Sequence, residues 1–142
     1  MNYQKVKLQM IKEKNFTYNS LKISSSIDVV KEVNKFEKLE NESEEKMILI
    51  CLNTKNQIVN YCEIASGGTN YCMIDPKTIF KSALLSNASK IILVHNHPSG
   101  DIKPSQEDLK LTERIKQVCE LVEIQLLDHI IIGDEDFKSI MN

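Results

Sequence analysis

The sequence lacks the features that would place the protein in a membrane or on a nucleic acid. Its apolar runs, such as residues 91–94 and 130–132, are far too short to span a bilayer, and no apolar stretch follows Met1. It has no run of five or more basic residues, and its formal net charge is −2. We therefore expect a cytoplasmic protein with no membrane partner, and charge gives no support for nucleic acid as a partner.

Paired cysteines are also missing. No two of the four cysteines are separated by the two to four residues that a zinc knuckle or a redox pair needs. We interpret them as free, buried or half-buried thiols in a reducing compartment. They are Cys51, Cys62, Cys72 and Cys119.

What is present is the composition of an ordinary globular protein, with 42% of the 142 residues apolar and 27% charged. A chain of this length can bury roughly two-thirds of the surface of its unfolded form, so it can build a core without disulfides. We expect a polar N-terminal arm over residues 1–25 and one domain over residues 26–142. The candidate docking points of the arm are Phe16, Tyr18 and Leu21.

Capping residues and apolar positions at helical spacing predict three helices. Ser25 and Asp28 have the spacing of a capping box, and Asp75 with Pro76 predicts the start of a second helix. A third helix is expected over residues 106–122. The residues expected to face the core are Ile27, Val30, Val33 and Phe36 in the first helix, Ile79, Phe80, Ala83 and Leu84 in the second, and Leu109, Ile115, Val118 and Leu121 in the third.

Apolar segments between these helices predict strands. Residues 47–52 and 57–64 are expected to form a hairpin, and residues 90–94 a central strand because they are β-branched and almost uniformly apolar. Residues 71–74 and 124–132 are the other predicted strands. Helices that alternate with strands indicate an α/β or α+β sandwich around one mixed sheet.

Two histidines follow the predicted central strand directly. His95 and His97 are two residues apart, so in extended backbone their imidazoles point to the same side of the sheet. Pro98 favours an extended conformation at His97 and ends the strand. The pair therefore stands where a strand meets a loop, which is a usual place for residues of an active site.

A carboxylate completes the pattern. Asp108 lies three residues after Ser105, in the first turn of the third predicted helix, where the helix dipole favours a negative charge. Two imidazoles and one carboxylate make three protein ligands, which leaves the open fourth position typical of catalytic zinc. A two-histidine, one-carboxylate iron site has the same ligands and stays open as an alternative.

The spacing of these residues matches a known family motif. His95-x-His97, seven residues, Ser105, two residues and Asp108 have the spacing of the JAMM motif of the MPN metallopeptidases. The longer string that begins at His95, together with residues 128–133, resembles the RadC family in particular.

The resemblance implies a fold and a set of roles. The fold is a three-layer sandwich similar to cytidine deaminase, with a mixed sheet flanked by helices. His95, His97 and Asp108 are implied to bind zinc, with Ser105 as a hydrogen-bond donor beside the metal. Glu45 is implied to be the general base, which takes a proton from the attacking water and passes it to the leaving amine. Other glutamates stand close to Glu45 in the sequence or across the hairpin, and the alternatives are Glu42, Glu44 and Glu63.

His129 has two interpretations. It either orients a metal ligand or is a structural histidine in the strand predicted over residues 124–132, and the structural role is favoured.

The leading functional hypothesis is a zinc-dependent peptidase or isopeptidase that acts on a peptide or protein conjugate. RadC relatives usually carry a helix-hairpin-helix segment, and none is seen in the first 40 residues, so we expect a stand-alone catalytic domain. The second hypothesis is a DNA-associated repair or mobile-element factor, whose binding would be salt-sensitive. The third is an interaction module that binds a metal without catalysis.

Overall fold

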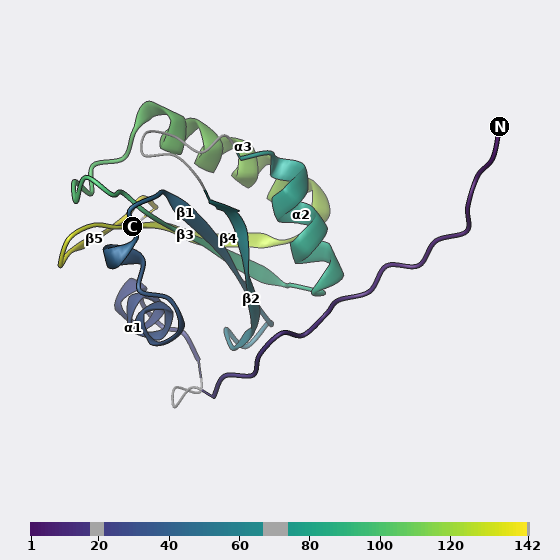
Figure 1. Cartoon of the computed structure of the whole chain (residues 1–142), viewed down its shortest axis with the longest axis horizontal. Coiled ribbons are helices and arrows are strands. Elements are labelled where there is room, and N and C mark those ends of the chain that lie inside the picture. The colour runs from purple at the N-terminus through teal and green to yellow at the C-terminus, as the bar shows by residue number, and fades with distance from the viewer. Residues whose placement is uncertain (18–21, 67–73, 142) are drawn as a thin grey trace.

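A mixed five-stranded sheet forms the centre of the protein, with strand order β2-β1-β3-β4-β5 (Figure 1). The computed structural model describes residues 1–17, 22–66 and 74–141. The strands are β1 Lys46–Leu52, β2 Ile58–Ser66, β3 Lys90–Asn96, β4 Gln125–Ile132 and β5 Phe137–Ser139. The helices are α1 Ser26–Phe36, the short 3-10 helix η1 Leu39–Asn41, α2 Pro76–Leu85 and α3 Gln106–Val122.

The sheet is mixed because β3 has neighbours of both directions. It pairs antiparallel with β1 and parallel with β4, while the outer strands β2 and β5 are antiparallel to their neighbours. The prediction that residues 90–94 form a central strand is confirmed. All residues of β3 after Lys90 are buried, as expected for a strand covered on both faces.

Alternate residues along the strands supply two cores, one on each face of the sheet. Leu49 and Leu93 belong to a core shared with α2 and α3. Ile48 and Val94 belong to the other core, which is shared with α1. The predicted three-layer α/β sandwich is therefore confirmed, with α2 and α3 covering one face and α1 the other (Figure 1).

The predicted capping residues begin the helices as expected. The capping box at Ser25 and Asp28 is formed, and Asp75 accepts a hydrogen bond from the backbone N–H of Lys77 at the start of α2. Four of the residues predicted to face the core are exposed instead. They are Ile27 at 52%, Leu84 at 53%, Leu109 at 42% and Leu121 at 84%.

The face of α3 was predicted wrongly for a physical reason. Apart from Ile115, which was predicted correctly, its buried residues are Asp108, Leu111, Thr112 and Cys119. This face includes the polar residues Asp108 and Thr112, so a prediction based on large apolar side chains puts Leu109 and Leu121 on the buried face instead. The helix is turned so that Asp108 faces the sheet, and the leucines then point to solvent.

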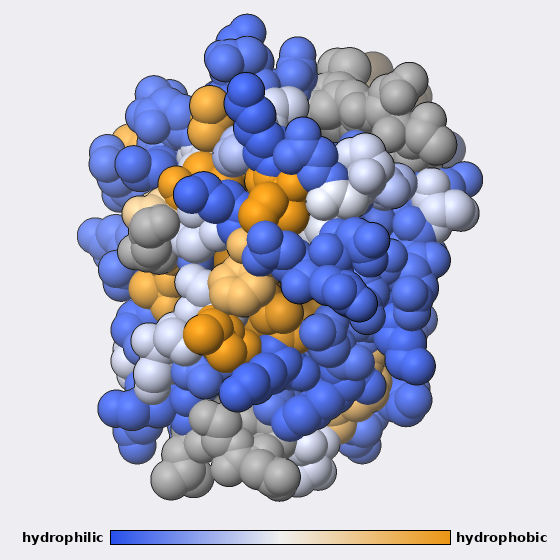
Figure 2. Space-filling view, turned by 90° about the vertical axis from the view of Figure 1, so that its left-hand side faces the viewer, coloured by the Kyte–Doolittle hydropathy of each residue, from blue (hydrophilic) through white to orange (hydrophobic). Residues whose placement is uncertain are grey.

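Two short elements were not predicted. In η1, Leu39 is fully buried, although it lies in an acidic segment. In β5, Phe137 is partly buried against the core on the α1 side of the sheet. Figure 2 shows the side of the molecule where α1 and β5 lie, with a group of hydrophobic residues surrounded by hydrophilic ones. The strand predicted over residues 71–74 lies outside the described residues except for Ile74.

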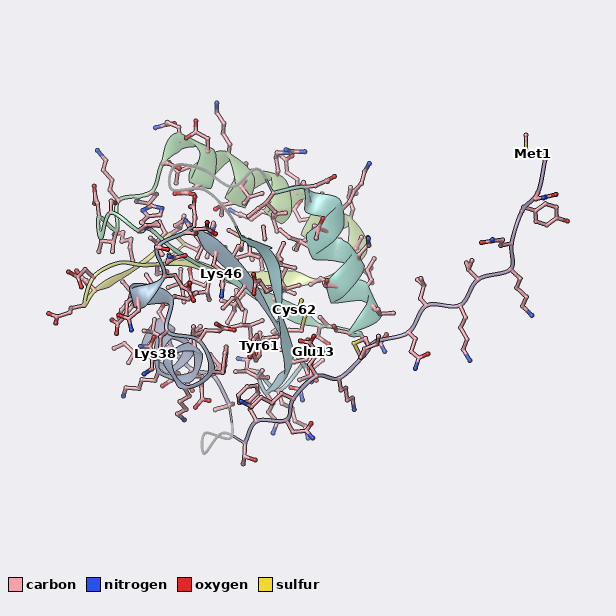
Figure 3. The ribbon with its side chains drawn as sticks, viewed as in Figure 1. Met1, Glu13, Lys38, Lys46, Tyr61 and Cys62 are labelled. Carbon is pink, nitrogen blue, oxygen red and sulfur yellow. The ribbon has the colours of Figure 1, made fainter. Side chains whose placement is uncertain are left out.

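The N-terminal residues 1–17 contain no helix or strand and lead away from the sheet (Figure 1). Phe16 contacts Phe36 and Tyr61, with ring centroids 5.5 and 5.6 Å apart. Glu13 lies beside Tyr61, whereas Met1 is at the far end of the arm (Figure 3). The other two predicted docking points, Tyr18 and Leu21, lie outside the described residues.

The domain boundary at residue 26 stays a prediction. Ile23, three residues before it, is buried in the α1-side core and donates its backbone N–H to the carbonyl of Asn56. None of the helices in the described part of the chain is long and apolar enough to cross a membrane.

Candidate metal site

His95 and His97 lie at the end of β3, where the central strand leaves the sheet. Their Nε2 atoms are 3.1 Å apart. His95 is buried and His97 is half-buried. Two nitrogen lone pairs at this distance repel each other unless a proton or a metal ion lies between them.

The orientation of His97 is fixed by the loop that follows it. Its Nδ1 lies 2.7 Å from the carbonyl oxygen of Asp101, and a carbonyl can only accept, so Nδ1 carries the proton and donates it. When the ring is neutral, Nε2 then carries no proton and its lone pair faces the site. Metal-binding histidines commonly donate their other ring N–H to a carbonyl in this way.

A glycine allows this loop to pack. Gly133, directly after β4, lies so close to the loop that an added Cβ would be 2.4 Å from the carbonyl oxygen of Gly100 and 2.5 Å from Ile102 Cγ2. The backbone N–H of His97 also donates to the carbonyl of Ile132 at 3.0 Å. The absence of a side chain at Gly133 therefore keeps the loop after His97 against the end of β4.

Asp108 reaches both histidines from the first turn of α3. Its Oδ1 is 3.2 Å from His95 Nε2, and its Oδ2 is 3.1 Å from His97 Nε2. Burial alone would raise the pKa of this carboxyl group, but the hydrogen bonds with His95 and His97 hold it far below its ordinary value. The hydrogen bond with Asp108 in turn raises the pKa of His97 above its ordinary value, against the effect of burial.

Ser105 holds the Asp108 carboxylate in place through a capping box. The backbone N–H of Ser105 donates to Asp108 Oδ2 at 2.8 Å, and Ser105 Oγ accepts from the Asp108 backbone N–H at 3.0 Å. The same two residues therefore cap α3 and bring a carboxylate to the histidines.

Glu45 enters the site from the position just before β1, the strand next to β3. Met47 of β1 is paired with His95, so Glu45, two residues earlier, lies on the same face at the same end of the sheet. Glu45 is buried, and its Oε1 is 3.7 Å from His95 Nε2. The alternatives lie elsewhere: Glu44 is exposed, and Glu42 and Glu63 form ion pairs with Lys46.

Asn96, between the two histidines, holds the backbone on both sides of Glu45. Its side chain is buried on the opposite face of β3. Its Oδ1 accepts from the Lys46 backbone N–H at 2.7 Å, and its Nδ2 donates to the Glu44 carbonyl at 3.0 Å. Sequence reasoning missed this role, since the bonded backbone groups lie some 50 residues away.

His129 lies behind His95 and is fully buried. Its Nε2 is 2.8 Å from His95 Nδ1, and its Nδ1 is 2.7 Å from Thr112 Oγ1. Burial lowers the pKa of His129 to about 3, so the ring is neutral at physiological pH. Thr112 was also missed, although its position four residues after Asp108 places both on one face of α3.

The donor atoms fit a metal ion. One ligand atom from each of Glu45, His95, His97 and Asp108 lies within 4.8 Å of the others. Zinc–ligand bonds of about 2.0–2.1 Å in a tetrahedron separate the ligand atoms by roughly 3.3 Å. The Nε2 atoms of His95 and His97 are 3.1 Å apart, and they lie 3.2 and 3.1 Å from Oδ1 and Oδ2 of Asp108, so these residues are already close to the spacing of ligands of a small cation.

Comparison with known proteins gives one consistent result. The profile of the RadC-like JAB domain matches residues 23–142. A UPF0758 protein of Clostridium perfringens is 43% identical over 120 residues, which is 84% of this chain and 52% of that protein. A UPF0758 protein of Halalkalibacterium halodurans is 45% identical over 98 residues, which is 69% of this chain and 42% of that protein. The chain thus spans about half the length of the curated relatives it matches, and their names state no activity.

Proposed function

The chain belongs to the RadC-like JAB domain family, and on this premise we propose that it is a zinc-dependent peptidase or isopeptidase. The family and the cluster of two histidines and two carboxylates together indicate a metal-dependent hydrolase. Zinc as the metal and an amide as the bond that is cut are the finer parts of the proposal. The observation that carries it is the convergence of four buried or half-buried ligand atoms at the end of a central strand.

His95, His97 and Asp108 are the proposed zinc ligands. Their neutral imidazoles and ionised carboxylate make three protein ligands and leave one tetrahedral position open. A zinc ion held there would supply Lewis acidity, polarising a substrate carbonyl and lowering the pKa of water. The short distances of Asp108 to both histidines support this assignment, because they bring its carboxylate to the point where the two Nε2 atoms converge.

Glu45 is the proposed proton carrier. When water adds to the amide carbonyl carbon, one of its protons passes to a Glu45 carboxylate oxygen. Glu45 then delivers that proton to the amide nitrogen, the C–N bond breaks, and the products are a carboxylic acid and an amine. The 3.7 Å between Glu45 Oε1 and His95 Nε2 is longer than the 3.1 to 3.2 Å among the three proposed ligands, which supports a residue that stands beside them. The same geometry favours catalysis over a metal-binding module without activity.

Ser105 is proposed to stabilise the oxyanion that forms at the carbonyl oxygen. Its Oγ already accepts the Asp108 backbone N–H, so its own proton is available for donation. The position at the N-terminus of α3 adds the positive end of the helix dipole. Donors arranged in advance around developing charge are a general source of rate enhancement.

Asn96→Ala is expected to slow hydrolysis while zinc binding is kept, because it frees the backbone on both sides of Glu45. The loss of two partly buried hydrogen bonds should also lower the free energy of unfolding by about 1–3 kcal/mol. Asn53→Ala is the control, since Asn53 also makes two hydrogen bonds to the backbone, its Oδ1 accepting from the N–H groups of Lys55 and Gln57 just after the other end of β1. Equal activity in the two variants, measured beside thermal unfolding, would contradict this role.

The proposal is tested by assaying the protein, zinc-loaded and after treatment with EDTA, on a panel of linear peptides and lysine ε-linked isopeptides. Mass spectrometry should detect a new amine and a new carboxylate with the zinc-loaded protein. Cleavage should fall to background after chelation and return when zinc is added. A protein that carries one zinc per chain and cleaves no member of the panel would contradict the proposed activity, as would cleavage that chelation leaves unchanged.

A further inference from the structure

A buried chain of hydrogen bonds runs from His95 back to α3. His95 Nδ1 lies 2.8 Å from His129 Nε2, and His129 Nδ1 lies 2.7 Å from Thr112 Oγ1. Thr112 Oγ1 in turn donates to the backbone carbonyl of Asp108 at 2.8 Å. Because His95, His129 and Thr112 are each at most 5% exposed, bulk water does not compete for these bonds.

The fold explains why these groups meet. β3 and β4 are parallel, and Leu93 is paired with His129, so both side chains lie on the face that α3 covers. His95, two residues after Leu93, points to the same face. Thr112 is one helical turn after Asp108, so it lies directly behind that carboxylate.

Metal binding allows only one direction for each bond in this chain. If His95 binds through Nε2, its proton is on Nδ1, and His129 Nε2 must accept it. A neutral imidazole has a single N–H, so His129 carries its proton on Nδ1 and donates it to Thr112. The single hydroxyl proton of Thr112 then goes to the Asp108 carbonyl, which is the acceptor that the structure provides.

The opposite direction would prevent metal binding. Thr112 would donate to His129 Nδ1, His129 Nε2–H would donate to His95 Nδ1, and the remaining proton of a neutral His95 would be on Nε2. That nitrogen faces His97 and Asp108, where the metal ligands converge. The hydrogen-bond chain therefore has two possible directions, and only one of them leaves a lone pair on His95 Nε2.

We propose that His129 and Thr112 are positioning residues that hold His95 in its metal-binding tautomer. Thr112 does so by accepting the His129 proton while it donates its own to the backbone of Asp108. The hydrogen-bond chain thereby links His95 on β3 to Asp108 on α3. This inference rests on the proposed metal site and adds two residues that lie behind it.

The test compares Thr112→Val with Thr112→Ser and the parent protein. Valine has nearly the same shape but leaves His129 Nδ1–H without an acceptor, whereas serine keeps the hydroxyl. Zn²⁺ affinity, measured by competition with a chromophoric chelator, is expected to fall about 10- to 100-fold in Thr112→Val. Thr112→Ser should remain within about threefold of the parent, well below the roughly 10- to 100-fold expected for the loss of such a partner.

A second measurement reads the tautomer directly. In the zinc-loaded parent, ¹⁵N NMR of labelled histidines should show His129 protonated on Nδ1 and bare on Nε2, a signature that a merely structural role would not require. A His129 ring protonated on Nε2 would overturn the inference even if Thr112→Val fails to fold. Equal zinc affinity in Thr112→Val and the parent would overturn it and leave the site intact. A parent that binds no Zn²⁺ would overturn the proposed site and this inference together.

Discussion

Glu45→Gln should leave zinc binding intact and slow hydrolysis by about 10²- to 10⁴-fold. Glutamine has nearly the same size, so it fits the buried position of Glu45 beside His95. It cannot take up a proton at physiological pH, so the transfer from water to the leaving amine is lost. Zinc content by mass spectrometry and kcat on a substrate found in the peptide panel are the two measurements.

The matched control for this variant is Glu44→Gln. Glu44 is the preceding residue, carries the same charge and is exposed, so its substitution tests charge without removing the buried carboxylate. We expect parent-like kcat in Glu44→Gln. Parent-like kcat in Glu45→Gln would remove Glu45 from the mechanism, and loss of zinc from that variant would mean that Glu45 is a ligand.

The order of the helices and strands was predictable, apart from the short elements η1 and β5, because its signals are local. Capping residues stand next to the helices they begin, and the apolar run that became β3 is continuous in the sequence. The buried face of α3 was not predictable from hydrophobicity, because Asp108 and Thr112 are buried while Leu109 and Leu121 are exposed. Tertiary contacts of polar residues decided that face.

The candidate site also has residues that local sequence spacing indicates and a residue that it does not. His95, His97 and Asp108 lie within 14 residues, so their spacing alone indicates a shared centre. Glu45 comes from the residue just before β1, and only the family resemblance pointed to it before the antiparallel pairing of β1 with β3 placed it there.

The supporting contacts of Asn96 and Thr112 could not be predicted from the sequence. Asn96 reads as a spacer between two histidines until its bonds to the backbone beside Glu45 are known. The role of Thr112 is likewise not visible in the sequence, because its two hydrogen bonds depend on how α3 lies against β4.

Asp108→Asn should weaken zinc binding by at least about 100-fold and leave the protein folded. The amide oxygen can still accept the Ser105 backbone N–H, so the cap of α3 is kept, but the ionised ligand is lost. A structural zinc site supplies about 10–16 kcal/mol, so one ligand of several accounts for a few kcal/mol, or two or more powers of ten in affinity. His97→Ala should have an effect of similar size, because its half-buried ring is removed from the same centre.

Asp101→Asn is the control that separates a lost ligand from a lost charge. Asp101 is exposed in the loop after His97 and contacts that histidine only through its backbone carbonyl, while its side chain accepts the Lys103 backbone N–H. Asparagine keeps both contacts and removes one negative charge near the site. If simple attraction between an acidic surface and a cation explained zinc binding, Asp101→Asn and Asp108→Asn would weaken it equally. Stoichiometric zinc in both Asp108→Asn and His97→Ala would show that the metal binds elsewhere, whereas a loss confined to these two variants requires a centre built from the end of β3 and the first turn of α3.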